Sequence, residues 1–231
     1  ERLAALAARG EGGRKEPERA FELYKRAADR GSPSAQYNVG VAYLRGEGVE
    51  NIPDGPCVFA PNHQSYLDAF FISAFMKKGV LKQTFFYAKA EHLRRGWQRF
   101  MANRHNVIIM DVNSDLKLSL QKLASALAQG KKVIIFPEGT RTVDGQLGTF
   151  KQTFAILGRE LDVPIVPIAI AGAYQALPRN RFFPKLFKPV AVSFLPPIVP
   201  QTGDDYGSLV DKAVSQIRAK LASKQPPEQP S

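Results

Sequence analysis

The chain has 231 residues, of which 44% are hydrophobic, and a formal net charge of +11. This length accommodates one good-sized domain and a smaller unit, and the hydrophobic share is ordinary for a folded protein, so a real core is expected. The single cysteine, Cys57, excludes an internal disulfide and favours a reducing compartment, and no stretch approaches the roughly 18 apolar residues that span a bilayer.

The positive charge is unevenly distributed along the chain. Residues 1–50 are close to neutral, and nearly all of the excess lies in residues 51–231. Such a surface favours an anionic partner: nucleic acid, an anionic membrane or a phosphorylated substrate.

Residues 1–49 are predicted to form a partial helical repeat. Arg9-Gly10-Glu11-Gly12 recurs 36 residues later as Arg45-Gly46-Glu47-Gly48, and the residues between favour helices at about 17–30 and 33–44. This pattern resembles Sel-type repeats, relatives of the tetratricopeptide family. Only about one and a third repeats are present, so the segment implies a protein partner or an incomplete array.

Residues 50–223 alternate between predicted strands and helices, and the Pro/Gln-rich tail 224–231 is predicted to be disordered. Strands are expected at 57–60, 84–88, 106–110, 132–136, 165–171 and 190–195, and helices at 68–76, 91–103, 114–130, 149–161 and 206–222. Alternation of this kind predicts an α/β fold with a largely parallel twisted sheet covered by helices on both faces.

The first candidate for chemistry is Asn62-His63-Gln64-Ser65-Tyr66-Leu67-Asp68, between the first of these strands and its helix. If His63 lies just before the helix and Asp68 in its first turn, the carboxylate can fold back to the imidazole. An Asp on one ring nitrogen fixes the tautomer and leaves the other nitrogen free to take a proton, which makes a general base with its orienter. Alternatively, Ser65-x-x-Asp68 is a capping box, and Asp68 only satisfies the helix start.

The second candidate is Phe136-Pro137-Glu138-Gly139-Thr140-Arg141-Thr142, directly after a buried strand. Gly139 lets the backbone approach a ligand closely, while Thr140 and Arg141 offer a hydroxyl and a planar cation suited to phosphate. Glu138 can receive a substrate hydroxyl or orient Arg141. The alternative is a turn with a surface salt bridge.

Together the two stretches resemble the glycerolipid acyltransferase family that includes lysophosphatidic acid acyltransferase. The family motif Asn-His-x-x-x-x-Asp is matched by Asn62, His63 and Asp68, and Phe-Pro-Glu-Gly-Thr-Arg is matched letter for letter by residues 136–141. Residues 163–167 and 88–91 match two further family blocks. The resemblance covers about residues 50–222.

This resemblance implies transfer of a fatty acyl group from acyl-CoA or acyl-carrier protein to the hydroxyl of a lysophospholipid resembling 1-acylglycerol-3-phosphate. His63 is then the general base, oriented by Asp68, and no cofactor, metal or covalent intermediate is expected. Backbone N–H groups near the first helix or Gly139 are candidate stabilisers of the oxyanion. The substrate-binding residues implied are Asn62, Ser65, Lys89, Arg104, Glu138, Gly139, Thr140 and Arg141.

One family block departs from this pattern. The family's Arg that contacts the acceptor phosphate is replaced here by Val112. Either Lys89, Arg141 or Arg104 supplies the missing charge, or the acceptor is not a simple phosphomonoester.

Residues 179–188 interleave cations with aromatic residues. On a lipid enzyme this pattern predicts contact with an anionic membrane surface, which places the protein in the cytoplasm and peripherally on the cytoplasmic face of a membrane. The residues implied are Arg179, Arg181, Phe182, Phe183, Lys185 and Lys188. The alternative is an ordinary basic loop whose aromatic side chains pack into the core.

Two other functions compete with the transferase. One is a non-catalytic lipid-binding or protein-interaction module recruited through the helical repeat. The other is nucleic-acid binding, which only the charge suggests and for which no recognition motif is visible.

Overall fold

The computed structural model describes residues 44–89, 106–110, 116–176 and 189–223, and residues 23, 26 and 30 individually. Leu23 and Arg26 are helical, as the predicted first helix of the repeat requires. The remainder of the predicted repeat helices up to residue 43, the basic helix 91–103, the stretch 179–188 and the tail 224–231 lie outside the described residues.

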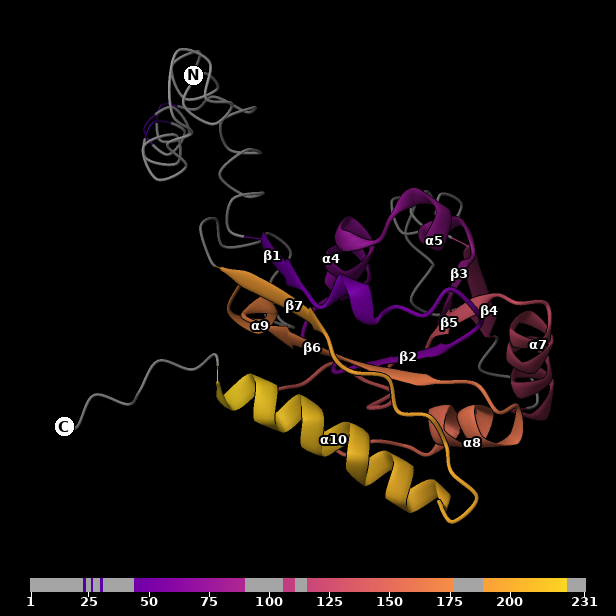
Figure 1. Ribbon diagram of the computed structural model, residues 1–231. Coiled ribbons are helices and arrows are strands. Elements are labelled where there is room, and N and C mark those ends of the chain that lie inside the picture. Colours follow the sequence, from indigo (N-terminus) through magenta and orange to yellow (C-terminus); the bar gives the residue numbers. More distant parts are fainter. Residues whose placement is uncertain are drawn as a thin grey trace.

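The described residues form a seven-stranded sheet in the order β1-β7-β6-β2-β5-β3-β4 (Figure 1). Every neighbouring pair is parallel except β6–β7, so the predicted, largely parallel sheet is confirmed. The strands are β1 (Leu44–Glu47), β2 (Val58–Pro61), β3 (Thr84–Lys89), β4 (Asn106–Met110), β5 (Lys132–Ile134), β6 (Ile165–Ala171) and β7 (Val190–Phe194).

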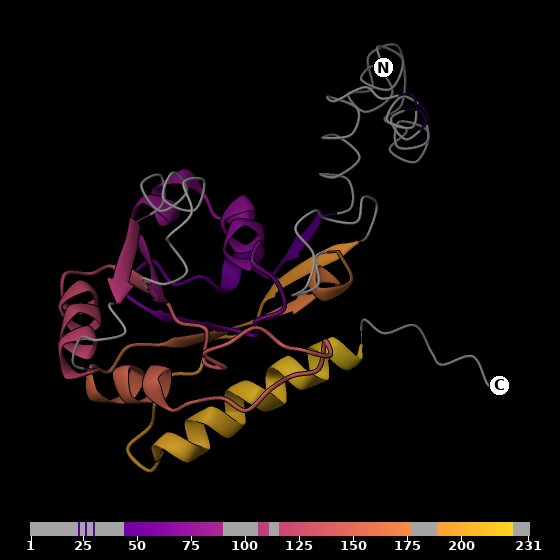
Figure 2. The same ribbon diagram turned by 180° about the vertical axis from the view of Figure 1, so that it is seen from behind.

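Helices cover both faces of the sheet, as predicted (Figures 1 and 2). One face packs against α7, α8 and α10 in a core that includes Leu123, Phe154 and Leu209, and the other packs against α4 in a core that includes Phe59 and Ile72. The helices are α4 (Asp68–Phe75), α5 (Lys78–Lys82), α7 (Leu116–Ala128), α8 (Thr153–Glu160), α9 (Ala173–Ala176) and α10 (Tyr206–Ala222), with a 3₁₀ turn η1 at Val49–Asn51.

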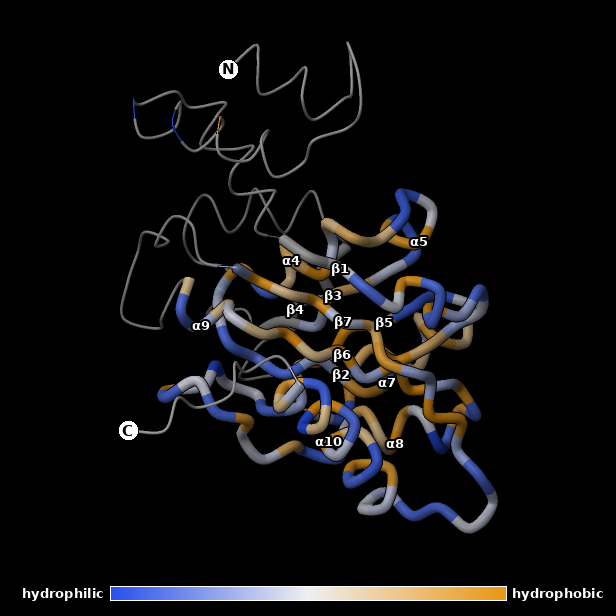
Figure 3. The backbone as a smooth tube through the Cα atoms, turned by 60° about the vertical axis from the view of Figure 1, so that its left-hand side comes forward, coloured by the Kyte–Doolittle hydropathy of each residue, from blue (hydrophilic) through white to orange (hydrophobic). Residues whose placement is uncertain are grey.

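Hydrophobic residues run through the central strands, while hydrophilic residues concentrate in the outer loops (Figure 3). β6 and α10 have the predicted bounds, whereas β5 is shorter and α8 begins four residues later than expected. The sequence did not predict α5 or α9, because helices of five and four residues are too short for a periodic pattern. None of the described helices combines the length and apolarity needed to cross a bilayer.

Strand β1 comes from the segment that the sequence assigned to the repeat. It pairs in parallel with β7 at the edge of the sheet, and Glu47 accepts hydrogen bonds from Ser193 Oγ at 2.5 Å and Lys220 Nζ at 2.7 Å. Leu44, the predicted last residue of a helix, is the first residue of this strand. The sheet therefore includes four residues ahead of the predicted boundary at residue 50, and that boundary stays a prediction.

Candidate active site

Both sequence motifs lie at the carboxyl end of the sheet. Strand β2 lies between β6 and β5, and all three are parallel. The first motif follows β2 and the second follows β5. Ligands of open α/β sheets bind in this position, beyond the carboxyl ends of the strands.

His63 and Asp68 are in direct contact. His63 Nδ1 lies 2.9 Å from Asp68 Oδ2, with the His63 side chain 21% exposed and the Asp68 side chain fully buried. The same oxygen accepts hydrogen bonds from the backbone N–H groups of Gln64 at 2.6 Å and Ser65 at 2.8 Å. Asp68 also begins α4, where the helix dipole favours negative charge. Half of the predicted capping box is therefore present, together with the predicted contact to the imidazole.

The imidazole of His63 is held so that one nitrogen is left for chemistry. Because an ionised carboxylate only accepts, the neutral imidazole that this contact favours carries its hydrogen on Nδ1 and its lone pair on Nε2. Nε2 has no hydrogen-bond partner within the described part of the chain. The ring also packs on Phe136, with centroids 4.2 Å apart. This arrangement can take a proton at Nε2.

Glu138 joins the second motif to the first. Its Oε1 accepts a hydrogen bond from the backbone N–H of His63 at 2.7 Å, and its Oε2 accepts from Gly148 N–H at 3.0 Å. Burial raises the pKa of Glu138 above its ordinary value, and these two hydrogen bonds oppose the shift. A return contact runs from Thr142 N–H to the carbonyl oxygen of His63 at 2.8 Å. These bonds place Glu138 between the two motifs, and its predicted roles of receiving a substrate hydroxyl or orienting Arg141 stay predictions.

Asn62 and Ser65 are buried rather than facing a ligand. Asn62 is 2% exposed, donates to the carbonyl oxygen of Ile170 at 3.0 Å and accepts from Ile170 N–H at 2.7 Å. Ser65 is fully buried, and its hydroxyl oxygen accepts from Leu67 N–H at 3.3 Å. Asn62 thus holds the His63 loop against β6, and Ser65 stabilises the turn into α4, while their predicted contacts with a substrate stay predictions.

Arg141 lies against an aromatic ring that sequence reasoning missed. Its guanidinium carbon is 3.2 Å from the centre of the Tyr66 ring, which is cation–π geometry between the two motifs. Tyr66 occupies one of the unspecified positions of the Asn-His-x-x-x-x-Asp motif, so no motif letter marks it.

Lys151 was also missed by sequence reasoning. Gly139 has a φ of +71°, and a Cβ built there lies 3.0 Å from Lys151 Nζ. A side chain at position 139 is therefore disfavoured by the backbone conformation, and a cation lies over this turn. Lys151 is outside every block quoted for the family resemblance, and only the folded chain brings it to Gly139.

Of the other predicted site residues, Thr140 is exposed beside Arg141, and Lys89 is the last residue of β3. Arg104 and Val112 lie outside the described residues. Of the backbone N–H groups near the first helix or Gly139, that of Gly139 donates to the carbonyl of Phe136 at 3.1 Å, and those of Gln64 and Ser65 donate to Asp68. Stabilisation of an oxyanion by the N–H groups of these two turns stays a prediction.

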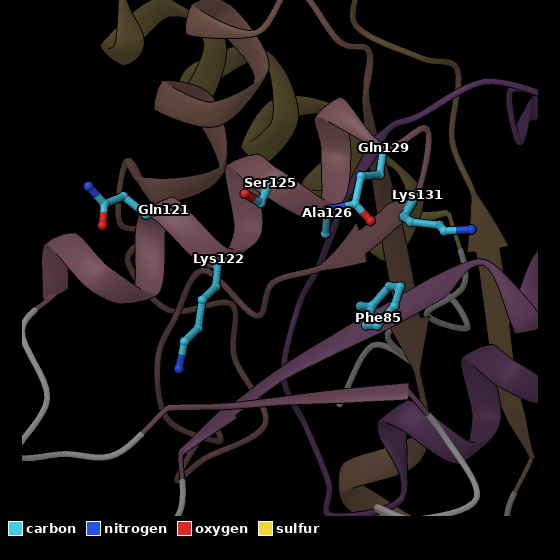
Figure 4. Close-up of a pocket in the computed structure, with 7 residues that line it drawn as sticks. All are labelled: Phe85, Gln121, Lys122, Ser125, Ala126, Gln129 and Lys131. Atoms are coloured by element: carbon cyan, nitrogen blue, oxygen red, sulfur yellow. The ribbon is translucent and has the colours of Figure 1, made fainter.

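A cavity of about 340 Å³ lies between α7 and β3, away from these residues (Figure 4). Its lining includes Phe85, Gln121, Lys122, Gln129 and Lys131, and no motif residue. Phe85 and Lys131 lie at the amino ends of β3 and β5, so the cavity and His63 lie at opposite ends of the strands. Among the described residues, no cluster of His, Cys, Asp and Glu suited to a metal ion occurs.

Comparison with known proteins gives matches to two families. The Acyltransferase family model matches residues 44–171, and the Sel1 repeat model matches residues 1–32 and 33–53. A chloroplastic 1-acyl-sn-glycerol-3-phosphate acyltransferase of Brassica napus is 31% identical over 76% of this chain and 49% of its own length. The Pseudomonas aeruginosa protein of that name is 38% identical over 58% of this chain and 52% of its own length.

A solved structure shares the fold. The crystal structure of the 1-acyl-sn-glycerophosphate acyltransferase of Thermotoga maritima has a TM-score of 0.65 at 21% identity, and the match covers 98% of this chain and 90% of that one. The predicted fold class is thereby confirmed, as are both resemblances drawn from the sequence. The chain spans about half the length of the curated relatives it matches.

Proposed function

Because the chain belongs to the Acyltransferase family, whose model matches more than half of its residues, we propose that it transfers a fatty acyl group to the hydroxyl of a lysophospholipid. The relatives' name, 1-acyl-sn-glycerol-3-phosphate acyltransferase, supports a singly acylated glycerol phosphate as the acceptor. The donor in this proposal is acyl-CoA or acyl-carrier protein. The observation that carries it is the contact of 2.9 Å between His63 Nδ1 and Asp68 Oδ2 at the carboxyl end of the sheet.

In the proposed reaction, His63 Nε2 removes the proton of the acceptor hydroxyl while the oxygen attacks the thioester carbonyl carbon. A C–O bond forms, the carbonyl electrons move to oxygen, and their return breaks the C–S bond. The thiolate leaves and takes the proton back from Nε2. Buried Asp68 stabilises the transient imidazolium, and general-base catalysis of this kind typically contributes about 10²–10⁴ in rate.

Two cations near the site are suited to the acceptor phosphate. Arg141 is held on the face of Tyr66, and the Lys151 ammonium lies over the turn at Gly139. Both lie between β5 and α8, Arg141 three residues and Lys151 thirteen residues after Glu138. We infer that they take the place of the family Arg that Val112 replaces, so that a phosphomonoester remains an acceptor.

The proposal extends to where the protein works. The excess positive charge and the amphiphilic acceptor favour a peripheral position on an anionic, cytoplasmic membrane face. The Sel1 match supports a protein partner for residues 1–53.

The test is release of free thiol from a long-chain acyl-CoA, with lysophosphatidate and lysophospholipids of other head groups as acceptors and His63→Ala as the control. Cys57 does not interfere, because burial raises the pKa of its thiol to about 12 and keeps it unreactive. Acceptor-dependent release that disappears in His63→Ala supports the transferase. If the folded protein releases no thiol from acyl-CoA or acyl-carrier protein with any acceptor, the non-catalytic module is the better reading.

A further inference from the structure

Large hydrophobic side chains are exposed around the candidate active site. Of the five such side chains exposed among the described residues, three belong to the segments that carry His63 and Arg141. They are Tyr66 and Phe70, each 45% exposed, and Val143, 71% exposed. We call these three residues the apolar rim.

Contacts tie the rim together across the two motifs. Tyr66 precedes α4 by two residues, and Phe70 is the third residue of that helix. The Tyr66 ring holds Arg141 at 3.2 Å, and Val143 follows Arg141 by two residues. Val143 is fixed in place because its carbonyl oxygen accepts the hydroxyl of Tyr174 at 2.8 Å. Tyr66 and Val143 are therefore held at the two motifs, and Phe70 follows on α4.

The fold leaves these side chains outside the core. The inward face of α4 packs Phe71 and Ile72 into the core, with Met76 just after the helix, whereas Phe70 is left 45% exposed. A helix that is apolar on more than its core-facing stripe is expected to be covered by something. What covers it must tolerate the cations that lie beside the rim.

We propose that the apolar rim docks on the surface of an anionic lipid bilayer and so turns the candidate active site toward its lipid substrate. Cations lie near the rim: Arg141 stacks on the Tyr66 ring, and exposed Lys77 and Lys78 follow the end of α4 by two and three residues. The neighbouring acid, Asp144, is turned into its own loop, where its carboxylate accepts from Thr142 Oγ1 and Gln146 N–H. Apolar side chains with adjacent cations are the combination that interfacial membrane binding requires.

This inference rests on the proposed function only for the identity of the lipid, since docking itself needs no turnover. It also differs from the basic stretch 179–188, the contact that the sequence predicted. The rim lies on the same segments as the general base, so docking by the rim would place the reacting hydroxyl near His63.

The test is co-sedimentation of the full chain with vesicles of phosphatidylcholine alone and of phosphatidylcholine with phosphatidylglycerol. The rim variant carries Phe70→Ser and Val143→Ser, and the matched control carries Leu118→Ser and Val199→Ser, which are exposed to similar degrees in other parts of the molecule. We expect the rim variant to bind anionic vesicles about tenfold more weakly and the control to bind like the parent protein. Equal vesicle binding by the rim variant and the control variant overturns the role of the rim in docking. Equal binding of the parent protein to the two kinds of vesicle overturns the proposed preference for anionic lipid.

A second measurement separates this inference from the proposed function. With a short-chain lysophospholipid in free solution, we expect the rim variant to keep its turnover, and with a long-chain acceptor in vesicles to lose most of it. If neither the parent nor any variant turns over any acceptor, the proposed acyltransferase function is wrong. The vesicle data still show whether the rim docks on a bilayer. If the rim variant instead loses self-association in gel filtration with vesicle binding unchanged, the rim contacts a second copy and the bilayer proposal is wrong.

Discussion

The backbone N–H of His63 donates a hydrogen bond of 2.7 Å to Glu138 Oε1, a residue 75 positions later in the chain. The second carboxylate oxygen of Glu138 accepts from Gly148 N–H, so one side chain bonds two loops. This bond joins the two sequence motifs at His63, the proposed general base, which lies just ahead of α4. Glu138 has the geometry of a positioning residue for His63.

Replacing Glu138 with Gln should therefore impair turnover. One amide oxygen can accept from either His63 or Gly148, but the amide NH₂ then faces a backbone N–H donor and leaves it without a partner. We expect kcat to fall by about 10–100-fold with a smaller change in acceptor KM. Glu160→Gln, at an exposed glutamate that accepts from Tyr206 Oη, is the control. Unchanged kcat in Glu138→Gln would show that this bond does not position His63.

The raised pKa of Glu138 also predicts a pH dependence of stability. A carboxyl whose folded-state pKa lies above its ordinary value of 4.5 contributes stability that is full below that value and is lost as the pH rises through the raised pKa. The difference in unfolding free energy between the parent protein and Glu138→Gln should therefore shift against the parent as the pH rises from about 4 toward neutrality. Urea unfolding at several pH values measures this difference, and a constant difference would contradict it.

Replacing Asp68 with Asn separates the two interpretations that the sequence left open. Asn caps helices well, so a capping role predicts little loss of activity. An orienting role predicts a large loss, because an amide can donate to Nδ1 and then stabilises the wrong tautomer. We expect kcat to fall on the order of 10³-fold, with the melting temperature of Asp68→Asn close to that of the parent. The kcat of His63→Ala gives the residual rate without the general base, against which the kcat of Asp68→Asn is compared.

The sequence predicted what depends on neighbouring residues. The bounds of β6 and α10 follow from local periodicity, and the His63–Asp68 contact spans only five residues across a strand-to-helix turn. Such features need no knowledge of which distant segments pair.

The sequence could not predict what depends on distant pairing. Asn62 looks available to a ligand until β6 places Ile170, 108 residues away, against both of its polar atoms. Gly46 and Glu47 read as repeat residues because their sheet partner, β7, lies more than 140 residues further along. In each case a long-range strand neighbour decides the outcome.

Tyr66 should matter for binding of a phosphorylated acceptor through its contact with Arg141. We expect Tyr66→Leu to raise KM for lysophosphatidate about 2–5-fold, the value of an exposed cation–π contact, with KM for an uncharged monoacylglycerol unchanged. Tyr66→Phe keeps the ring and should restore the parent KM. Equal effects on both acceptors, or none in Tyr66→Leu, would contradict a role through Arg141.

The last prediction concerns the edge strand β1. Gly48 directly follows it with a φ of +72°, and a Cβ there would collide with the carbonyl oxygen of Phe194 in β7. Gly48→Ala should therefore push β1 from the sheet and lower the free energy of unfolding on the order of 2 kcal/mol. Gly203→Ala is the matched control, because a Cβ at Gly203 meets nothing within 4 Å, and it should change stability by less than about 0.5 kcal/mol. Equal unfolding midpoints for the two variants would mean that the β1–β7 pairing contributes nothing to the stability of the acyltransferase domain, and that residue 50 is the better boundary.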